Sequence, residues 1–174
     1  YISNESGPLS SNLSELLKLL MIQFSQKDWM KTFPSWALFL DSSFVDLSGY
    51  VHPELLDGEG RSVVVMNANA LKNSRGIREL AHEMIHVLHN SHRPYEMWWV
   101  KEGLAEVGRN YLFCERDYDL QEAYLEPKVS LTFEPNKFDA KKIDLKPQYA
   151  IAGLYFNFLM KHCGGEKLFT RLLE

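Results

Sequence analysis

The sequence predicts an α+β protein, in which a small mixed sheet and a histidine-bearing helix pack on a mostly helical C-terminal part. Apolar runs with strand character precede residue 67, whereas helical periodicity dominates after residue 74. The length fits one domain with a sizeable core. We therefore expect residues 1–174 to form a single domain, with an α/β part over about 1–92, a helical part over about 93–174 and a cleft between them.

The composition excludes several classes of protein. A formal net charge of -4 argues against a nucleic-acid partner, because phosphate binding needs clustered excess Lys and Arg. No apolar run approaches the length of a membrane span. Cys114 and Cys163 are too few for a disulfide scaffold, and two buried thiols are favoured over one bridge. A removed secretion signal is compatible with a chain that begins at Tyr1, so compartment and oligomeric state stay open.

The N-terminal part contains one predicted helix and up to three strands. Residues 11–24 have an apolar stripe of helical period and a serine in the N-cap position. Residues 36–40 form a short apolar run after a proline and are expected to be a strand. A short strand near residues 50–52 fits between turn residues. Residues 61–66 form the best strand, because three consecutive valines favour the pleated conformation.

Asn73 or Ser74 is expected to cap the helix that follows. Its apolar stripe predicts a face that packs on the core, and the bisector of His82 and His86 points away from that face. We therefore expect the two histidines to face the cleft. The stripe consists of Ile77, Leu80, Ala81, Met84, Ile85 and Leu88.

The C-terminal part is expected to contain three more helices. The first runs from about Met97 to Val107, and the second from Tyr149 to Lys161. Between them, residues 113–148 are polar and irregular, either shaping access to the cleft or forming a plain loop with a short helix. Two glycines precede the last helix, over 166–173. The predicted core stripe of the second helix is Ile151, Leu154, Tyr155, Phe158 and Leu159.

The chemistry-bearing motif is His82-Glu83-x-x-His86. On a helix the two histidines lie on adjacent turns, about 40° apart around the axis, so both imidazoles can bind one ion. Glu83 lies on the flank, where it can act on a metal-activated water as general base. A hydrolytic zinc site needs a third protein ligand and one open position.

Two residues are candidates for the third ligand. The spacing of His92 resembles the metzincins, whose HExxHxxGxxH motif turns sharply after the helix. Here His89 stands in place of the glycine, and no Met-turn is evident, so we expect His89 and His92 to be bystanders near the rim. Glu102 lies in Trp99-Val100-Lys101-Glu102-Gly103-Leu104-Ala105-Glu106, which resembles the Trp-x-x-Glu-Gly-x-Ala-Glu pattern of the gluzincins, the thermolysin-like and aminopeptidase-N-like zinc peptidases.

The resemblance covers roughly residues 62–173 and implies Zn²⁺ bound by His82, His86 and Glu102. It also implies that Glu106 hydrogen-bonds a ligand histidine from outside the metal shell. Gly103 is expected to let its helix approach the first closely. The 15 residues between His86 and Glu102 are fewer than in aminopeptidase-N-like enzymes, which shortens the intervening loop.

Two further roles follow from the resemblance. Asn67-Ala68 resembles the edge-strand segment whose backbone pairs with an extended peptide, although a strand-ending turn is an equal alternative. Tyr149 is the candidate for stabilising the oxyanion, with a purely structural role as the alternative. The sequence thus predicts a zinc-dependent peptidase acting on a peptide or protein substrate. The alternatives are an inactive binding or scaffold domain and a metzincin-like protease with His92 as third ligand.

Overall fold

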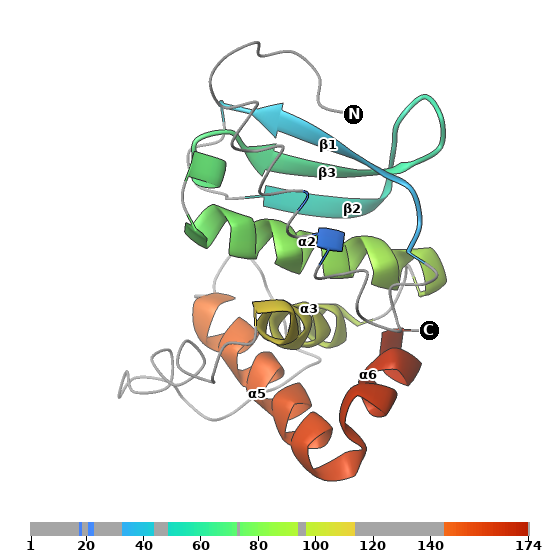
Figure 1. Ribbon diagram of the computed structural model, residues 1–174, viewed down its shortest axis with the longest axis vertical. Coiled ribbons are helices and arrows are strands. Elements are labelled where there is room, and N and C mark those ends of the chain that lie inside the picture. Colours follow the sequence, from blue (N-terminus) through green and yellow to red (C-terminus); the bar gives the residue numbers. More distant parts are fainter. Residues whose placement is uncertain are drawn as a thin grey trace.

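The computed structural model describes residues 18, 21–22, 33–43, 49–72, 74–93, 97–113 and 145–173. These residues form an α+β fold, which confirms the predicted class. Their elements are the strands β1 (Trp36–Asp41), β2 (Gly49–Leu56) and β3 (Ser62–Asn67), the short 3₁₀ helix η2 (Ala70–Lys72), and the helices α2 (Ser74–His92), α3 (Trp98–Phe113), α5 (Leu145–Cys163) and α6 (Gly165–Leu173) (Figure 1).

The sheet is mixed, as predicted. Its order is β1-β3-β2, with β3 parallel to β1 and antiparallel to β2. The run of valines forms the central strand β3, whose residues are buried on both faces. β2 extends beyond the predicted strand at residues 50–52, and its pairing is irregular between Val51 and Leu56. Pro53 lies in this stretch and cannot donate a ladder hydrogen bond, so an edge strand is the position that tolerates it.

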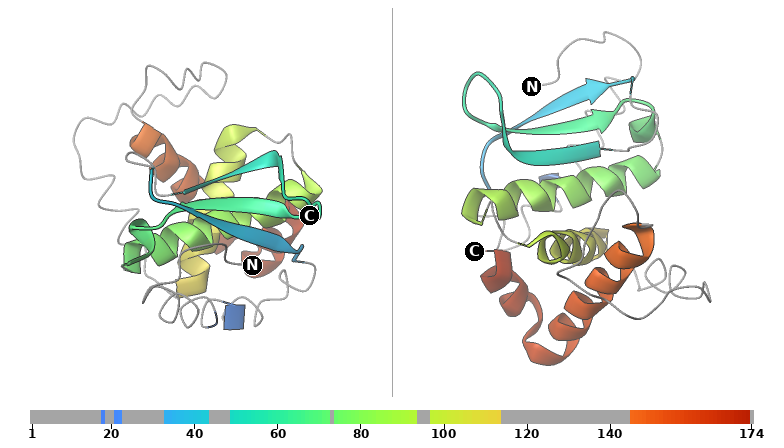
Figure 2. Two further views of the ribbon diagram at one scale, coloured as in Figure 1. Left: turned by 90° about the horizontal axis from the view of Figure 1, so that it is seen from above. Right: turned by 180° about the vertical axis from the view of Figure 1, so that it is seen from behind.

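Figure 1 shows α2 between the sheet and α3, with α5 and α6 on the far side of α3. The predicted apolar stripe of α2 is buried, as expected. More of the helix is buried than this stripe alone. Val87 and the polar residues His82, Glu83, His86 and His89 are buried as well. Figure 2 shows that α3 crosses α2 rather than lying alongside it. The division into two parts with a cleft between them stays a prediction.

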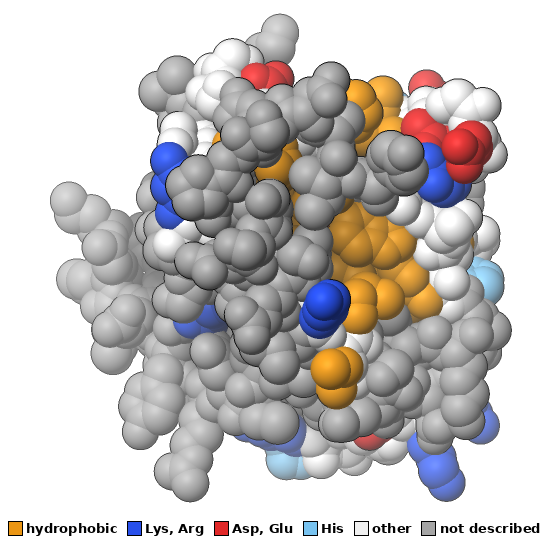
Figure 3. All heavy atoms as spheres, turned by 45° about the horizontal axis from the view of Figure 1, so that its top comes forward, with side chains coloured by type: hydrophobic (Ala, Val, Ile, Leu, Met, Phe, Trp, Pro, Cys, Tyr) orange, Lys and Arg blue, Asp and Glu red, His pale blue; other side chains and the backbone are white. Residues whose placement is uncertain are grey.

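The sheet presents its second face away from α2. The register places Leu38 and Val64 on the face that joins the core, and Phe39 and Val65 on the opposite face. Val65 is buried there, whereas Phe39 is half exposed. Figure 3, which brings the top of Figure 1 forward, shows hydrophobic side chains gathered on this side of the molecule.

Gly103 has a different neighbour from the expected one. A Cβ atom at this position would lie 2.4 Å from Cδ2 of Phe156 and 2.9 Å from the carbonyl oxygen of Ala152, both on α5. The glycine therefore allows α3 to approach α5, and the prediction that it serves the contact with α2 is wrong. Gly108 has that role, because a Cβ there would lie 2.7 Å from Ile85 on α2.

The predicted core stripe of α5 is wrong for Tyr155 and Phe158, whereas Leu159 packs against the core as expected. Tyr155 is 50% exposed and Phe158 is 57% exposed, whereas Ala152, Phe156 and Met160 are buried. Both sides of this helix carry apolar residues, so periodicity alone could not select the buried face. The contact of Phe156 with the glycine surface of α3 selects it instead.

Some predictions lie outside the described residues. Of the helix over 11–24, only Lys18, Met21 and Ile22 are described, and they are helical. Most of the segment over 113–148 and Cys114 also lie outside them. Cys163 is an exposed free thiol, so the prediction that it is buried is wrong. In the described part of the chain no helix is long and apolar enough to cross a membrane.

We expect Gly103→Ala to lower the free energy of unfolding by about 1–2 kcal/mol. Overpacking typically costs about 1–3 kcal/mol, and the clash with the backbone oxygen of Ala152 puts this site at about 2–3 kcal/mol, which outweighs the gain of about 1 kcal/mol from alanine's helix propensity. Urea denaturation measures the change. Gly58→Ala is the control, because a Cβ at that turn has no atom within 4 Å. Equal stability of Gly103→Ala and the parent would contradict the close approach of α3 and α5.

Candidate metal centre

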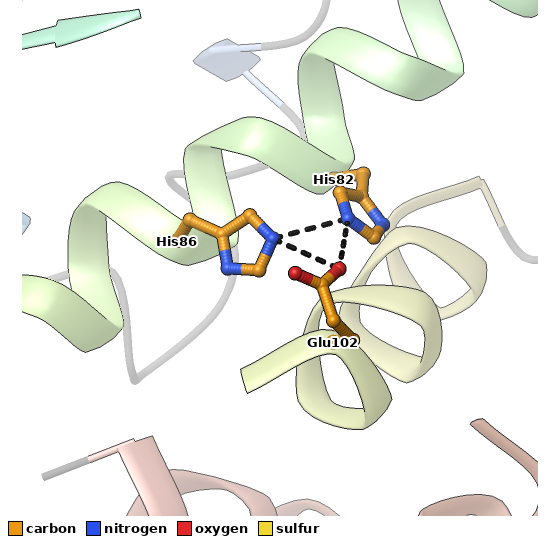
Figure 4. A group of neighbouring side chains, drawn as sticks. All are labelled: His82, His86 and Glu102. Atoms are coloured by element: carbon orange, nitrogen blue, oxygen red, sulfur yellow. Dashed lines mark hydrogen bonds and ion pairs between the residues drawn. The ribbon is translucent and has the colours of Figure 1, made fainter. Parts of the chain in front are cut away.

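Three ligand-type side chains from two helices converge on one point. Nε2 of His82 lies 3.1 Å from Nε2 of His86 and 3.1 Å from Oε2 of Glu102. The third side of this triangle, from Nε2 of His86 to Oε2 of Glu102, is 3.3 Å. Figure 4 shows both imidazoles pointing from α2 toward the carboxylate on α3. The structure thus brings together the three residues that the sequence predicted as metal ligands.

Local helix geometry and the crossing of two helices position these groups. His82 and His86 lie one turn apart on α2, so both rings point to the side that α3 crosses. Lys101, beside Glu102, donates a hydrogen bond of 2.8 Å from Nζ to Oδ1 of Asn90 on α2. Leu104 and Ala105 anchor the same stretch of α3 in the core. The carboxylate therefore meets the imidazoles from a packed helix rather than from a loop.

The donor set fits a divalent zinc ion. Ligand atoms bound tetrahedrally at about 2.0–2.1 Å lie about 3.3–3.4 Å from one another, close to the three observed separations. Two imidazole nitrogens and one carboxylate oxygen are the protein ligands of hydrolytic zinc sites, which keep a fourth position open. Among the described residues, His82, His86 and Glu102 form the group that could hold a metal.

Glu106 lies beside His82, as the resemblance implies. Its Oε1 is 3.2 Å from Nδ1 of His82, on the side of the ring opposite the atom that faces Glu102. This distance is that of an ion pair, but the two groups do not have the geometry of a hydrogen bond. A carboxylate at this position favours a proton on Nδ1 and leaves Nε2 to bind a metal.

The buried charges shift one another's pKa. Burial disfavours the charged form of His82, but the hydrogen bond with Glu102 and the negative charges of Glu102 and Glu106 outweigh it and raise its pKa well above 6.5. Burial alone would raise the pKa of Glu102, yet the charge of His86 and the hydrogen bond of His82 lower it strongly. The carboxylates thus stay ionised when a positive charge lies between them. In the metal-free protein that charge is a proton on an imidazole.

Glu83 follows His82 on α2 and is also buried. Its burial raises the pKa of the carboxyl group, while the charges of His86 and His82 act in the opposite direction. A carboxylate with a raised pKa accepts a proton more readily than a solvated one. The role of Glu83 as general base stays a prediction.

Tyr149 on α5 borders the same site. Its ring centroid lies 6.3 Å from that of His82 and 5.1 Å from that of Trp98. Burial raises the pKa of its phenol strongly, and the charges of Glu102, Glu83 and Glu106 raise it further, while a hydrogen bond with Trp98 lowers it. The phenol is therefore protonated at neutral pH and able to donate a hydrogen bond.

The remaining histidines of α2 lie elsewhere. His89 is completely buried, so the prediction that it stands near the rim is wrong. His92 is exposed at the last residue of α2. The helix continues unbroken from His86 to His92, so it lacks the sharp turn with which a metzincin returns its third histidine. The geometry thus favours Glu102 over His92 as the third ligand.

Asn67 and Ala68 do not lie on an edge strand. Asn67 ends β3, which is the central strand of the sheet. Its side chain accepts a hydrogen bond of 2.8 Å from the backbone N–H of Asn69, which stabilises the turn into η2. Ala68 donates from its backbone N–H to the carbonyl oxygen of Asp41 on β1. The edge-strand interpretation is therefore wrong, and the alternative of a strand-ending turn is observed.

The sequence interpretation missed Arg109 and Glu79, which contact each other and extend the site away from His82. Nη2 of Arg109 donates to Oε2 of Glu106, and Nη1 donates to Oε1 of Glu79 at 3.2 Å. The spacing of Glu106 and Arg109, three residues apart on one helix, is the signal that could have pointed to the first contact. The second joins two helices and has no local signal.

Comparison with known proteins gives no relative for this chain. No family model, no curated protein and no solved structure matches it. The resemblance to gluzincins thus rests on the motif residues and their spacing. What it implies about activity therefore has to be tested by experiment.

The metal-free protein is expected to lose stability as the pH rises above 6.5. The raised pKa of His82 contributes stability that is complete below the unfolded value of 6.5 and is lost as the pH rises through the folded value. The depressed pKa of Glu102 contributes stability above 4.5 that is lost in acid. Metal-free protein should thus be most stable between these two values.

Thermal denaturation in a chelator, from pH 4.5 to about pH 9, measures this dependence. His82→Asn should flatten the decline above pH 6.5, whereas His52→Asn, at an exposed position on β2, should leave it in place. A Tm that stays level or rises with pH in this range would contradict the pairing of His82 with the two glutamates.

Proposed function

We propose that this protein is a zinc-dependent peptidase of the gluzincin type, with zinc bound by His82, His86 and Glu102. The observation that carries the proposal is the triangle of two imidazole nitrogens and one carboxylate oxygen, with a second buried carboxylate, Glu83, beside it. Nitrogen and oxygen donors of this kind favour zinc over calcium or magnesium, which prefer oxygen ligands alone.

His82, His86 and Glu102 would hold the zinc ion with three protein ligands. The ion would supply Lewis acidity toward a peptide carbonyl and would lower the pKa of water toward neutrality. His82 and His86 hold their rings on adjacent turns of a buried helix, so their Nε2 atoms need little rearrangement to bind. Glu102 supplies a negative charge that partly neutralises the dication.

We assign to Glu83 both proton transfers of the hydrolysis. As general base it takes a proton from the attacking water, and as general acid it then delivers the proton to the leaving amine. Burial raises the pKa of its carboxyl group, which brings that pKa closer to the pH at which the enzyme would work. The reaction is peptide-bond hydrolysis without a covalent intermediate on the enzyme.

We assign to Tyr149 the stabilisation of the oxyanion that develops on the carbonyl oxygen. Its phenol is protonated at neutral pH, and burial and three nearby carboxylates raise its pKa further. A neutral donor fixed beside the metal ligands stabilises negative charge as it forms on the carbonyl oxygen. The edge-to-face contact with the Trp98 ring, at 5.1 Å between centroids, restricts the orientation of the phenol.

Glu83→Gln should lower kcat/KM for peptide hydrolysis by about 10²–10⁴-fold, the usual contribution of a general acid–base group. Zinc content should be unchanged, because Glu83 is not one of the three ligands. A library of quenched fluorescent peptides reports the activity, and metal analysis reports the zinc. Glu54→Gln, at an exposed position on β2, is the matched control and should keep full activity.

Undiminished hydrolysis by Glu83→Gln would overturn the proposed mechanism. Zinc bound by the parent protein without hydrolysis of any peptide would instead favour a binding or scaffold domain that retains the metal site. A parent that binds no zinc would overturn both.

The third ligand can be tested separately. Glu102→Gln should weaken zinc binding by more than about 100-fold, beyond the range for groups outside the metal shell, whereas His92→Ala should change it by less than about twofold. Competition with a chromophoric chelator measures both dissociation constants. The reverse result, with zinc lost from His92→Ala and retained by Glu102→Gln, would establish the metzincin-like arrangement.

A further inference from the structure

Three contacts in a row link four side chains of α2 and α3 beside the candidate metal centre, and one turn of α2 closes this row into a ring. Glu79 and His82 lie three residues apart on α2, and Glu106 and Arg109 lie three residues apart on α3. His82 meets Oε1 of Glu106 at 3.2 Å, Arg109 donates to Oε2 of Glu106, and Arg109 also donates to Oε1 of Glu79 at 3.2 Å. The two oxygens of Glu106 thus face a metal-ligand candidate on one side and a guanidinium on the other.

The ring lies largely out of contact with water. The side chains of Arg109 and Glu106 are each 11% exposed, and that of Glu79 is 25% exposed. A buried carboxylate without a compensating charge is strongly unfavourable, so Glu106 depends on the cation beside it. The planar guanidinium presents its N–H groups in a rigid fork and can therefore hold two carboxylates in a fixed geometry, whereas the ammonium of lysine is a point charge without such a fork.

We propose that Arg109 is a positioning residue for the metal centre, which holds one oxygen of Glu106 so that the other faces Nδ1 of His82, with Glu79 anchoring the guanidinium from α2. This inference rests on the proposed metal site. Glu106 in that orientation keeps the proton of His82 on Nδ1 and its Nε2 free to bind the metal. Without Arg109, the carboxylate can rotate away from His82.

The competing explanation is that the ring only fastens α2 to α3. Such a role would lower the stability of the metal-free protein but would not act on the metal through Glu106. A double-mutant cycle distinguishes the two, because residues that act through one another have non-additive effects. The cycle combines Arg109→Met with Glu106→Gln and follows the dissociation constant for zinc.

In the parent background, Arg109→Met should weaken zinc binding by about 10-fold, within the range for partners of ligand histidines. In the Glu106→Gln background, the same change should have almost no further effect. Arg171→Met, at an exposed position on α6, is the matched control and should leave zinc affinity unchanged. The Tm of each metal-free variant is recorded beside its zinc affinity.

Two gentler variants keep the test valid if Arg109→Met does not fold. Arg109→Lys should give an intermediate loss of zinc affinity, because the ammonium keeps the positive charge but lacks the rigid fork that fixes both carboxylates. Glu79→Gln should give a smaller loss, of about 2- to 10-fold, since it removes only the anchor. In both variants, the absorption spectrum of bound cobalt(II) should shift from that of the parent, because it reports the arrangement of the ligands.

Unchanged zinc affinity in all three variants would overturn the inference while leaving the metal site in place. An equal loss from Arg109→Met in the parent and Glu106→Gln backgrounds would also overturn it, because Arg109 would then act independently of Glu106. If the parent binds no zinc, the proposed metal site itself fails and this inference fails with it.

Discussion

Helix α2 runs between the sheet and α3 with His82, Glu83 and His86 buried among its apolar side chains. Polar groups in such a position need partners, because their hydration is lost on folding. The partners come from α3, where Glu102 and Glu106 lie on either side of the His82 ring. The crossing of these two helices is thus at once the centre of the core and the place where the charges meet.

The same crossing explains why the site contains so many carboxylates. Glu83, Glu102 and Glu106 are all buried or nearly so, and the histidines and Arg109 supply the compensating positive charge. An imidazole can carry one proton, whereas a divalent ion can neutralise more of this charge. A cluster that is only partly balanced without metal is well suited to bind one, and its metal affinity should depend on the protons that the ion displaces.

The three residues of the candidate metal site could be predicted from the sequence. Four residues along one helix fix the relation of His82 to His86, and the pattern around Glu102 supplied the third candidate ligand. That they bind a metal stays a prediction. The contacts between helices had no such signal. Apolar residues on both sides of α5 left its buried face undecided, and the neighbour of Gly103 depended on which helix packed closest. For Asn67, strand order within the sheet decided the outcome, and no local pattern encodes strand order.

The position of the ligands along the chain has a consequence for the way the protein folds. All three ligands and Glu106 lie within residues 82–106, so closing the loop between α2 and α3 costs little conformational entropy. The parallel pairing of β1 with β3 instead joins strands that are separated by the whole of β2. Contacts of short sequence separation form faster than distant ones. A metal ion at the proposed site would therefore fasten α2 to α3 before the sheet is complete, and would so direct the order of assembly.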